Sequence, residues 1–203
     1  MRTSLVAVAV LLLTLPVLGQ GGGVTMNGWQ GRTDSGRADI NDLSFREMGG
    51  GFHVTTGPHA IFWNPSNTGS GTYTLSATFT QTKASSHPNS FGLFFGGGDL
   101  NGDGQAYTYF LIREDGQFLL KKRMGSDTEN LAGGWAAHSA VNALDGGRMT
   151  NTLSVEVGAS NVRFLSNGTE VASVPKAGLA VDGVAGVRFS HQLDVHVSDF
   201  LVN

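Results

Sequence analysis

The segment 73–82 has the clearest alternation of apolar and polar side chains in the chain. A period of two predicts a β-strand with one face against a core and the other in solvent. Short apolar or alternating segments recur between turn-forming residues, and none has a convincing helical period. The predicted strands are 43–46, 52–55, 60–63, 73–82, 91–95, 106–113, 117–123, 153–157, 162–165, 169–174, 184–189 and 195–202. Many short strands without long helices predict an all-β sandwich or barrel.

The segment 90–123 organises this pattern, because three predicted strands follow one another within it. A loop rich in Gly, Asp and Asn joins the first two strands, and Asp115-Gly116 turns the last two. Asp-Gly between apolar runs predicts a two-residue type I′ turn, which would place Tyr109 opposite Lys122. Both faces of this hairpin carry large apolar side chains, so we expect it in the middle of its sheet, either covered on both sides or covered on one side and functional on the other.

Two further local signals make specific predictions. Asn167-Gly168, between two alternating segments, predicts a second type I′ turn. Asp199 stands where the apolar phase slips between Val197 and Phe200, which predicts a β-bulge.

The first residues have the pattern of an export signal. Arg2 supplies a positive charge, 5–18 are apolar, and 17–19 offer small or neutral residues before a cut. We therefore expect 1–19 to be a signal peptide, 20–27 a flexible lead-in and 28–203 a single β-sandwich domain. The alternative is an uncleaved anchor, but the apolar run is shorter than the ~20 residues of a spanning helix. We expect no membrane span once the signal is removed.

Composition narrows the class of protein. The chain has no cysteine, which removes both disulfides and the acylated cysteine of a lipoprotein. An exported domain of this size without disulfides is typical of a bacterial periplasmic or secreted protein. The net charge is −3 without a basic stripe, so we expect no nucleic acid partner.

One loop has the spacing of a calcium site. Asp99, Asn101 and Asp103 precede Gly104 as in the first half of a calcium-binding loop, where alternate oxygens point inward. The position of the usual bidentate Glu is occupied by Phe110, so a plain turn-rich connection is the competing interpretation. Calcium is the one candidate cofactor. The six histidines have no zinc-site spacing, and we expect them at scattered surface or loop positions.

Aromatic and cationic residues are the remaining candidates for ligand binding. Tyr107, Tyr109 and Trp63 are suited to stack on sugar rings, and Arg113 and Lys122 to donate to sugar hydroxyls. Core packing is the competing interpretation for these aromatics. Catalytic residues stay unassigned, because the chain has no Gly-x-Ser-x-Gly, no cysteine nucleophile and no phosphate loop.

The order of several segments resembles a known class of fold. The sequence runs FGLFFGG, a Gly/Asp loop, YTYFLIREDGQFLLKKR, NTLSVEV, VRFLSNGTEVASV and DVHVSDFLV. This order resembles the concanavalin A-like lectin and glucanase jelly rolls, and most of all the bacterial 3-keto-disaccharide hydrolase-type domain. The resemblance covers about 43–203 and implies an antiparallel two-sheet β-sandwich that binds or processes glycans. Glycosidases of this class carry an E-x-D-x-x-E strand, whereas 153–157 offers only Glu156.

Three functions therefore stay open. We favour an exported glycan-binding domain without catalysis, whose partner is an oligo- or polysaccharide. The alternatives are a glycoside-processing hydrolase of the 3-keto-disaccharide type and a structural or interaction domain of the cell envelope. This order of preference rests on analogy between folds. Such an analogy indicates a class of ligand but gives no mechanism.

Overall fold

The computed structural model describes residues 22–203, so the predicted signal peptide and residues 20–21 of the lead-in lie outside the described residues. The elements are β1 (Gly23–Val24), β2 (Gln30–Thr33), a short 3-10 helix η1 (Ile40–Asp42), β3 (Ser44–Met48), β4 (Gly51–Thr55), β5 (Ala60–Gly69), β6 (Tyr73–Gln81), β7 (Ser90–Gly98), β8 (Ala106–Arg113), β9 (Gln117–Met124), β10 (Asp127–Asn130), β11 (Ala136–Ala137), β12 (Met149–Val157), β13 (Asn161–Ser166), β14 (Thr169–Pro175), β15 (Gly183–Phe189) and β16 (Asp194–Val202). Within 22–203, no helix is long and apolar enough to cross a membrane.

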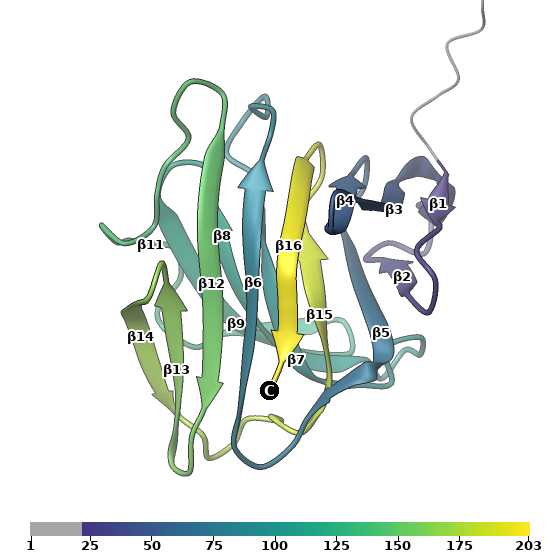
Figure 1. The fold of residues 1–203 in the computed structure, drawn as a ribbon. Coiled ribbons are helices and arrows are strands. Elements are labelled where there is room, and N and C mark those ends of the chain that lie inside the picture. The colour runs from purple at the N-terminus through teal and green to yellow at the C-terminus, as the bar shows by residue number, and fades with distance from the viewer. Residues whose placement is uncertain (1–21) are drawn as a thin grey trace, which may run out of the picture.

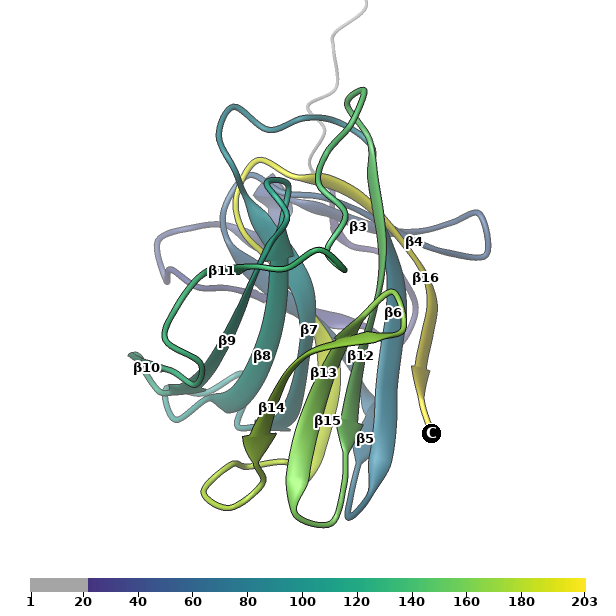
Figure 2. The same ribbon diagram turned by 90° about the vertical axis from the view of Figure 1, so that its left-hand side faces the viewer.

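The strands form two sheets that pack face to face (Figures 1 and 2). Sheet A has the order β1-β3-β4-β16-β6-β12-β13-β14. Sheet B has the order β10-β9-β8-β7-β15-β5-β2, with β11 beside β9. Neighbouring strands are antiparallel, except that β1 runs parallel to β3. The antiparallel two-sheet β-sandwich predicted from the sequence is thereby confirmed.

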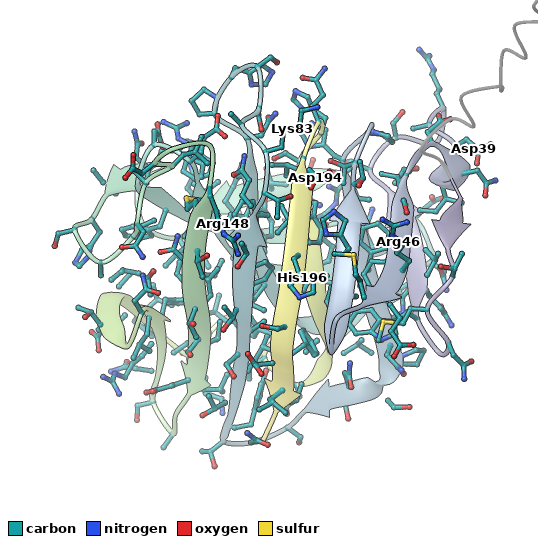
Figure 3. All side chains as sticks on the ribbon, turned by 45° about the horizontal axis from the view of Figure 1, so that its top comes forward. Asp39, Arg46, Lys83, Arg148, Asp194 and His196 are labelled. Carbon is teal, nitrogen blue, oxygen red and sulfur yellow. The ribbon has the colours of Figure 1, made fainter. Side chains whose placement is uncertain are left out.

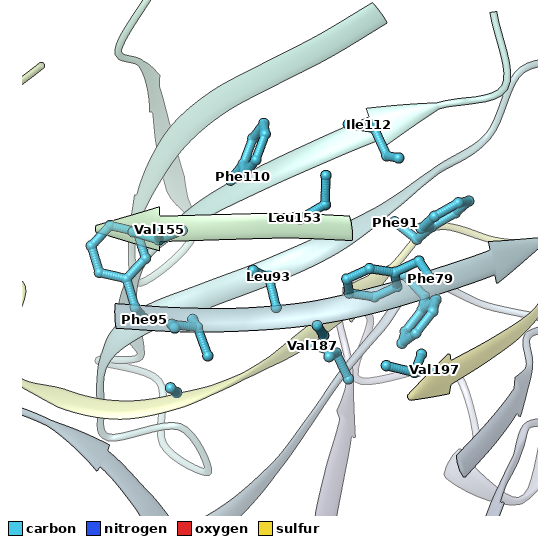
Figure 4. Close-up of a cluster of buried hydrophobic side chains, with 14 of the residues drawn as sticks. Phe79, Phe91, Leu93, Phe95, Phe110, Ile112, Leu153, Val155, Val187 and Val197 are labelled. Atoms are coloured by element: carbon cyan, nitrogen blue, oxygen red, sulfur yellow. The ribbon is translucent and has the colours of Figure 1, made fainter. Parts of the chain in front are cut away.

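The core lies between the sheets and is built from alternate side chains of each strand. Figure 4 shows Phe79 and Leu153 of sheet A beside Phe91, Phe110 and Val187 of sheet B, all fully buried. Along β6, every second residue from Tyr73 is buried, as the alternation predicted. The inner faces thus use one phase of each strand and leave the other phase for the two outer faces.

The register predicted for the β8–β9 hairpin is wrong by one residue. Arg113 pairs with Gln117, so Tyr109 lies opposite Lys121 and Leu111 opposite Leu119. The loop has three residues instead of two, and of these only Gly116 has a positive φ, 78°. A type I turn followed by a left-handed glycine is the usual three-residue alternative to a type I′ turn. The consequence is that Lys121, and not Lys122, shares a face with the tyrosines.

The structure confirms the predictions for the second turn and for the bulge. Asn167 and Gly168 both have positive φ, 52° and 79°, in a two-residue turn between β13 and β14. The β16 register shifts between Ser198 and Leu201, and Asp199 there has a φ of 54°. Both the second type I′ turn and the bulge are confirmed. At the other end of the chain, Gly23–Val24, which lie within the predicted lead-in 20–27, form β1 beside β3.

Candidate functional site

The two outer faces of the sandwich differ in character. The outer face of sheet A carries hydroxyls that bond to one another: Thr78 lies 2.9 Å from Thr152, and Thr80 lies 3.0 Å from Thr150. Charged and imidazole side chains such as His196 project from the same side of the molecule (Figure 3). Such a surface is typical of the solvated side of an antiparallel sheet.

The outer face of sheet B instead carries a second apolar cluster, separate from the core. We call it the outer cluster. It consists of Ile61, Trp63, Phe94, Leu100, Tyr107, Tyr109, Leu111 and Leu119. It forms because both phases of β5, β7 and β8 carry large apolar side chains. At Gly186 of β15 the backbone leaves room for the Phe94 ring, which an added Cβ would meet at 2.5 Å.

A buried arginine lies against the outer cluster. Arg188 of β15 donates from Nη1 to Asp34 Oδ1 at 2.9 Å and to the Tyr107 hydroxyl at 2.9 Å, and from Nη2 to Asp34 Oδ2. Its guanidinium carbon lies 5.1 Å from the centre of the Tyr109 ring. Arg188 is only 8 % exposed. A buried charge of this kind is tolerated when it is paired and hydrogen-bonded, and this one has a carboxylate, a hydroxyl and an aromatic ring.

The electrostatics of this group follow from its geometry. Burial opposes ionisation of Asp34, but the hydrogen bonds and charge of Arg188, with a contribution from Arg123, hold the pKa of Asp34 below its ordinary value. Burial raises the pKa of Tyr107 and of Tyr109, against the opposing effect of Arg188. At neutral pH the group therefore contains an ionised carboxylate, a guanidinium and two neutral phenols.

Three more cations lie on the same face. The β8–β9 register places Lys121 beside Tyr109 and Arg123 beside Tyr107. Arg32 of β2 stands opposite Ile61 and donates to the backbone carbonyls of Leu100 and Gly102, which fixes the β7–β8 loop at this face.

A chain of three histidines lies next to Asp34. The amide of Asp34 donates to the His59 carbonyl at 3.0 Å. The His191 ring joins two others: its Nδ1 is 2.9 Å from His59 Nε2 and its Nε2 is 3.0 Å from His87 Nε2. Burial lowers the pKa of His59, although the charge of Asp34 opposes this effect. Because His191 uses each nitrogen for a different partner, the arrangement is a hydrogen-bonded chain.

The expectation of scattered histidines is thus wrong for these three. They come from three loops far apart in the sequence, so local spacing gave no sign of their contact. Among residues 22–203, no group of three or more His, Cys, Asp or Glu side chains is arranged to hold a metal ion.

A hollow at the same end of the molecule offers a competing place for a ligand. It is lined by polar loop residues, among them Thr56, Lys83, Ser86 and Gln192. None of its lining residues within the described chain is aromatic or arginine. From residues 22–203 it offers polar groups but no aromatic ring, whereas the Arg188 group combines both, so we prefer the Arg188 group as the candidate site.

The ligand residues predicted from the sequence are only partly brought together. Tyr107, Tyr109 and Trp63 share the outer cluster. Arg113 lies on the same side at the end of β8, where it bonds to Asp115 at 2.8 Å and stacks 4.5 Å from the centre of the Trp135 ring. Lys122 points to the opposite side of β9.

There the Lys122 ammonium pairs with Glu129 at 3.0 Å. The one-residue change of register is the reason that this lysine leaves the face of the tyrosines.

The loop predicted to bind calcium uses its side chains locally. Asp99 accepts the Gly104 amide at 3.0 Å, and Asn101 donates to the Gln30 side chain at 3.2 Å. These contacts fit a turn-rich connection whose first aspartate closes its own loop. Asp103 is exposed in the same loop. Calcium binding by Asp99, Asn101 and Asp103 stays a prediction.

Sequence reasoning missed Arg188 and Asp34. One signal was present: Arg188 is the only charged residue in the strand Gly183–Phe189, whose other residues are apolar or glycine. A lone arginine in such a strand indicates a buried partner. The partner itself had no local signal, because Asp34 lies far away in the sequence.

Comparison with known proteins agrees with this architecture. No family model and no curated protein matches the sequence. Among solved structures, the carbohydrate-binding module CBM66 from Bacillus subtilis has 12 % identity and a TM-score of 0.64, over 89 % of this chain and 98 % of that one. A Bacillus subtilis protein of unknown function with a galectin-like fold has 13 % identity and a TM-score of 0.54, over 90 % and 96 %.

A third similar structure is a GH16 protein from the mixed-linkage glucan locus of Bacteroides ovatus, in complex with a G4G4G3G product. It has 11 % identity and a TM-score of 0.55, over 88 % of this chain and 85 % of that one. At such low identity, the likeness shows the fold alone. The chain therefore has a concanavalin A-like jelly-roll fold.

Proposed function

We propose that this protein binds glycans without catalysis, at the outer face of sheet B. The observation that carries the proposal is the group formed by Arg188, Asp34, Tyr107 and Tyr109 on the outer face of sheet B. A sheet face that only meets solvent has no need of a buried, fully paired arginine on an aromatic base. The carbohydrate-binding module with the same fold supports this class of ligand. Export to the periplasm or beyond is part of the proposal, from the sequence of residues 1–19.

The arrangement suits binding because its donors are held in place before the ligand arrives. Asp34 and Tyr107 fix the Arg188 guanidinium from two sides. The Tyr109 hydroxyl makes no hydrogen bond within residues 22–203, and it is not among the side-chain atoms buried without a partner. It is therefore free to bond to a sugar hydroxyl. Groups fixed in advance lose little conformational entropy when the ligand binds.

The same geometry disfavours glycosidase chemistry. Hydrolysis of a glycosidic bond needs a carboxylic acid with a raised pKa and a second carboxylate across the bond. The carboxylate in this group is Asp34, and Arg188 lowers its pKa, which keeps it ionised. An ionised carboxylate has no proton to give to a leaving group.

One observation favours the hydrolase alternative of the 3-keto-disaccharide type. The chain of His59, His191 and His87 lies beside Asp34, and imidazoles transfer protons near neutral pH. Turnover of a 3-keto-glucoside that is lost in His191→Ala would establish this alternative. Absence of turnover by a protein that binds glycans would exclude it.

Binding can be tested with the purified chain on a glycan array, followed by titration of the best ligand. Tyr109→Phe removes one hydroxyl and should weaken binding by about 0.5–1.5 kcal/mol, which is roughly 2- to 10-fold. Thr78→Val, on the outer face of sheet A, is the control and should bind like the wild type. Equal loss in both variants, or no glycan bound at millimolar concentration, would contradict the proposal.

A further inference from the structure

We infer that the ligand of this face is an anionic saccharide, one that carries carboxylate or sulfate groups. The inference rests on the proposed function and narrows its ligand. The first reason is the charge of the face: the cations Arg32, Lys121, Arg123 and Arg188 lie there around the carboxylate of Asp34. The whole chain, by contrast, has a net charge of −3. A cationic face on an acidic protein attracts anions locally and increases their rate of association.

The carboxylates around this face do not neutralise it. Asp115 is paired with Arg113 at the far end of β8. Glu129 is paired with Lys122 on the opposite side of β9. In the β7–β8 loop, Asp99 turns its carboxylate onto its own loop, where it accepts the Gly104 amide.

Among the remaining charged groups, Asp103 is an exposed residue of that loop and makes no ion pair within 22–203. His59 at the end of the face adds positive charge when it is protonated.

Two of the cations have N–H groups that are not used in hydrogen bonds within residues 22–203. Lys121 is half-buried and forms no ion pair or side-chain hydrogen bond within the described part of the chain. Arg123 bonds through Nε to the Gly125 carbonyl at 2.8 Å, and its Nη1 lies 3.7 Å from Asp34 Oδ2. Its Nη2 forms no hydrogen bond, and no ion pair shorter than 3.7 Å, within residues 22–203. An oriented guanidinium beside a free ammonium is suited to bind a carboxylate or sulfate by charge-assisted hydrogen bonds.

The aromatic rings argue in the same direction. Stacking of the apolar face of a neutral sugar needs an exposed aromatic ring. Here Tyr107 is 1 % exposed, Trp63 is 3 % exposed and Tyr109 is 4 % exposed, and the Arg188 guanidinium lies over Tyr109. The rings therefore support the cations and offer little stacking surface of their own. Recognition at this face depends on charge.

The test compares polymers that differ only in charge. Polygalacturonate is titrated beside its fully methyl-esterified form, and dextran sulfate beside dextran. The first pair probes carboxylates and the second probes sulfates. We expect at least one charged polymer to bind about tenfold more tightly than its neutral partner, because hydrogen bonds to charged groups are stronger than those between neutral groups. Its affinity should fall several-fold between 50 and 300 mM NaCl, since salt screens partly exposed charges.

Adjacent residues of β9 provide matched variants. Lys121→Ala should weaken binding of the charged polymer several-fold and reduce the salt dependence. Lys122→Ala, one residue along and on the opposite side of the strand, should leave both unchanged. The melting temperature of each variant shows that the fold is intact.

Each other outcome contradicts the inference in a recognisable way. Equal affinity for charged and neutral polymers would overturn it and leave the proposed function standing. Binding to single-stranded DNA as tight as to the acidic polymers would indicate a general anion site, which also overturns it. If no polymer of either kind binds, the proposed function itself fails, and the inference fails with it.

Discussion

Arg188 is a single residue that determines the character of one face of the molecule. Its guanidinium contacts Asp34, which follows β2, and Tyr107 and Tyr109, which both belong to β8. Buried ion pairs add little net stability compared with apolar packing, but removal of one partner leaves the other charge buried and unpaired. The pair therefore contributes more to the orientation of its neighbours than to the free energy of unfolding.

The substitution Asp34→Asn should show how much stability is lost when the buried charge of Arg188 has no partner. The amide retains a hydrogen-bond acceptor but leaves the Arg188 charge uncompensated, so we expect destabilisation of about 3 kcal/mol at neutral pH. The pKa of Asp34 lies below its ordinary value. Its contribution to stability is therefore present above about pH 3.9 and is lost as the pH falls through the lower folded pKa.

Denaturant unfolding at a series of pH values checks both expectations. The difference in stability between wild type and Asp34→Asn should shrink as the pH falls below about 4. A difference that stays constant down to pH 2 would mean that the Asp34 carboxylate gains nothing from Arg188.

At this scale, the sequence predicted the aromatic members of the site but not its charges. Tyr107, Tyr109 and Trp63 stand in apolar strands, where alternation alone assigns them to a face. Arg188 and Asp34 meet only because β15 and the residues after β2 are neighbours of β5 in the folded sheet. A contact of that kind depends on strand order, which no local pattern encodes.

At the scale of elements, local signals predicted strands well and one turn badly. Asn167-Gly168 formed the expected turn because both residues adopt positive φ. Asp115-Gly116 is compatible with two turn geometries, a two-residue loop and a three-residue loop, which differ in whether Asp115 also adopts positive φ. The sequence is compatible with both, and in the folded chain only Gly116 does so. The choice moved every pair of the β8–β9 ladder by one residue and decided which lysine joins the face.

Gly116→Val should destabilise the domain by at least about 1–2 kcal/mol, because a Cβ is unfavourable at a φ of 78° and a β-branched side chain more so. For a domain of this size that corresponds to a fall in melting temperature of about 2–8 °C. The control is Gly36→Val, in a loop where φ is not left-handed and a Cβ meets no atom within 4 Å. If both variants melt like the wild type, the loop does not require a left-handed residue.

At the scale of the whole molecule, the sequence predicted the two-layer architecture but not which outer face is unusual. The alternation of apolar and polar residues shows which residues of a strand lie on the same side. It does not tell which side of sheet B meets the core when both phases are apolar, as in β7 and β8. The outer cluster became visible only once the packing of the two sheets had assigned Phe110 inward and Tyr109 outward.

The stability of the whole domain should depend on pH near neutrality. Burial lowers the pKa of His53, whose Nε2 lies 3.1 Å from Asp194 Oδ1, and it also lowers the pKa of His59. A histidine with a lowered folded pKa stabilises the fold above its unfolded pKa of about 6.5, and this contribution is lost as the pH falls below that value. We expect the melting temperature to decrease from pH 7.5 to pH 5.

The decrease should be smaller in His53→Gln, which cannot titrate. A melting temperature that is the same at pH 7.5 and pH 5 in the wild type would show that neither ring is held neutral by the fold.

The place of β15 and β16 in the sheets has a consequence for the order of folding. These two strands come late in the chain, yet β16 lies between β4 and β6 in sheet A, and β15 lies between β7 and β5 in sheet B (Figure 1). Without them each sheet is divided into two separate groups of strands. Pairing across such long sequence separations is slow, because the entropy of closing a long loop must be lost first. A growing chain therefore stays open until residues 183–202 have been synthesised, and these residues then complete both sheets together.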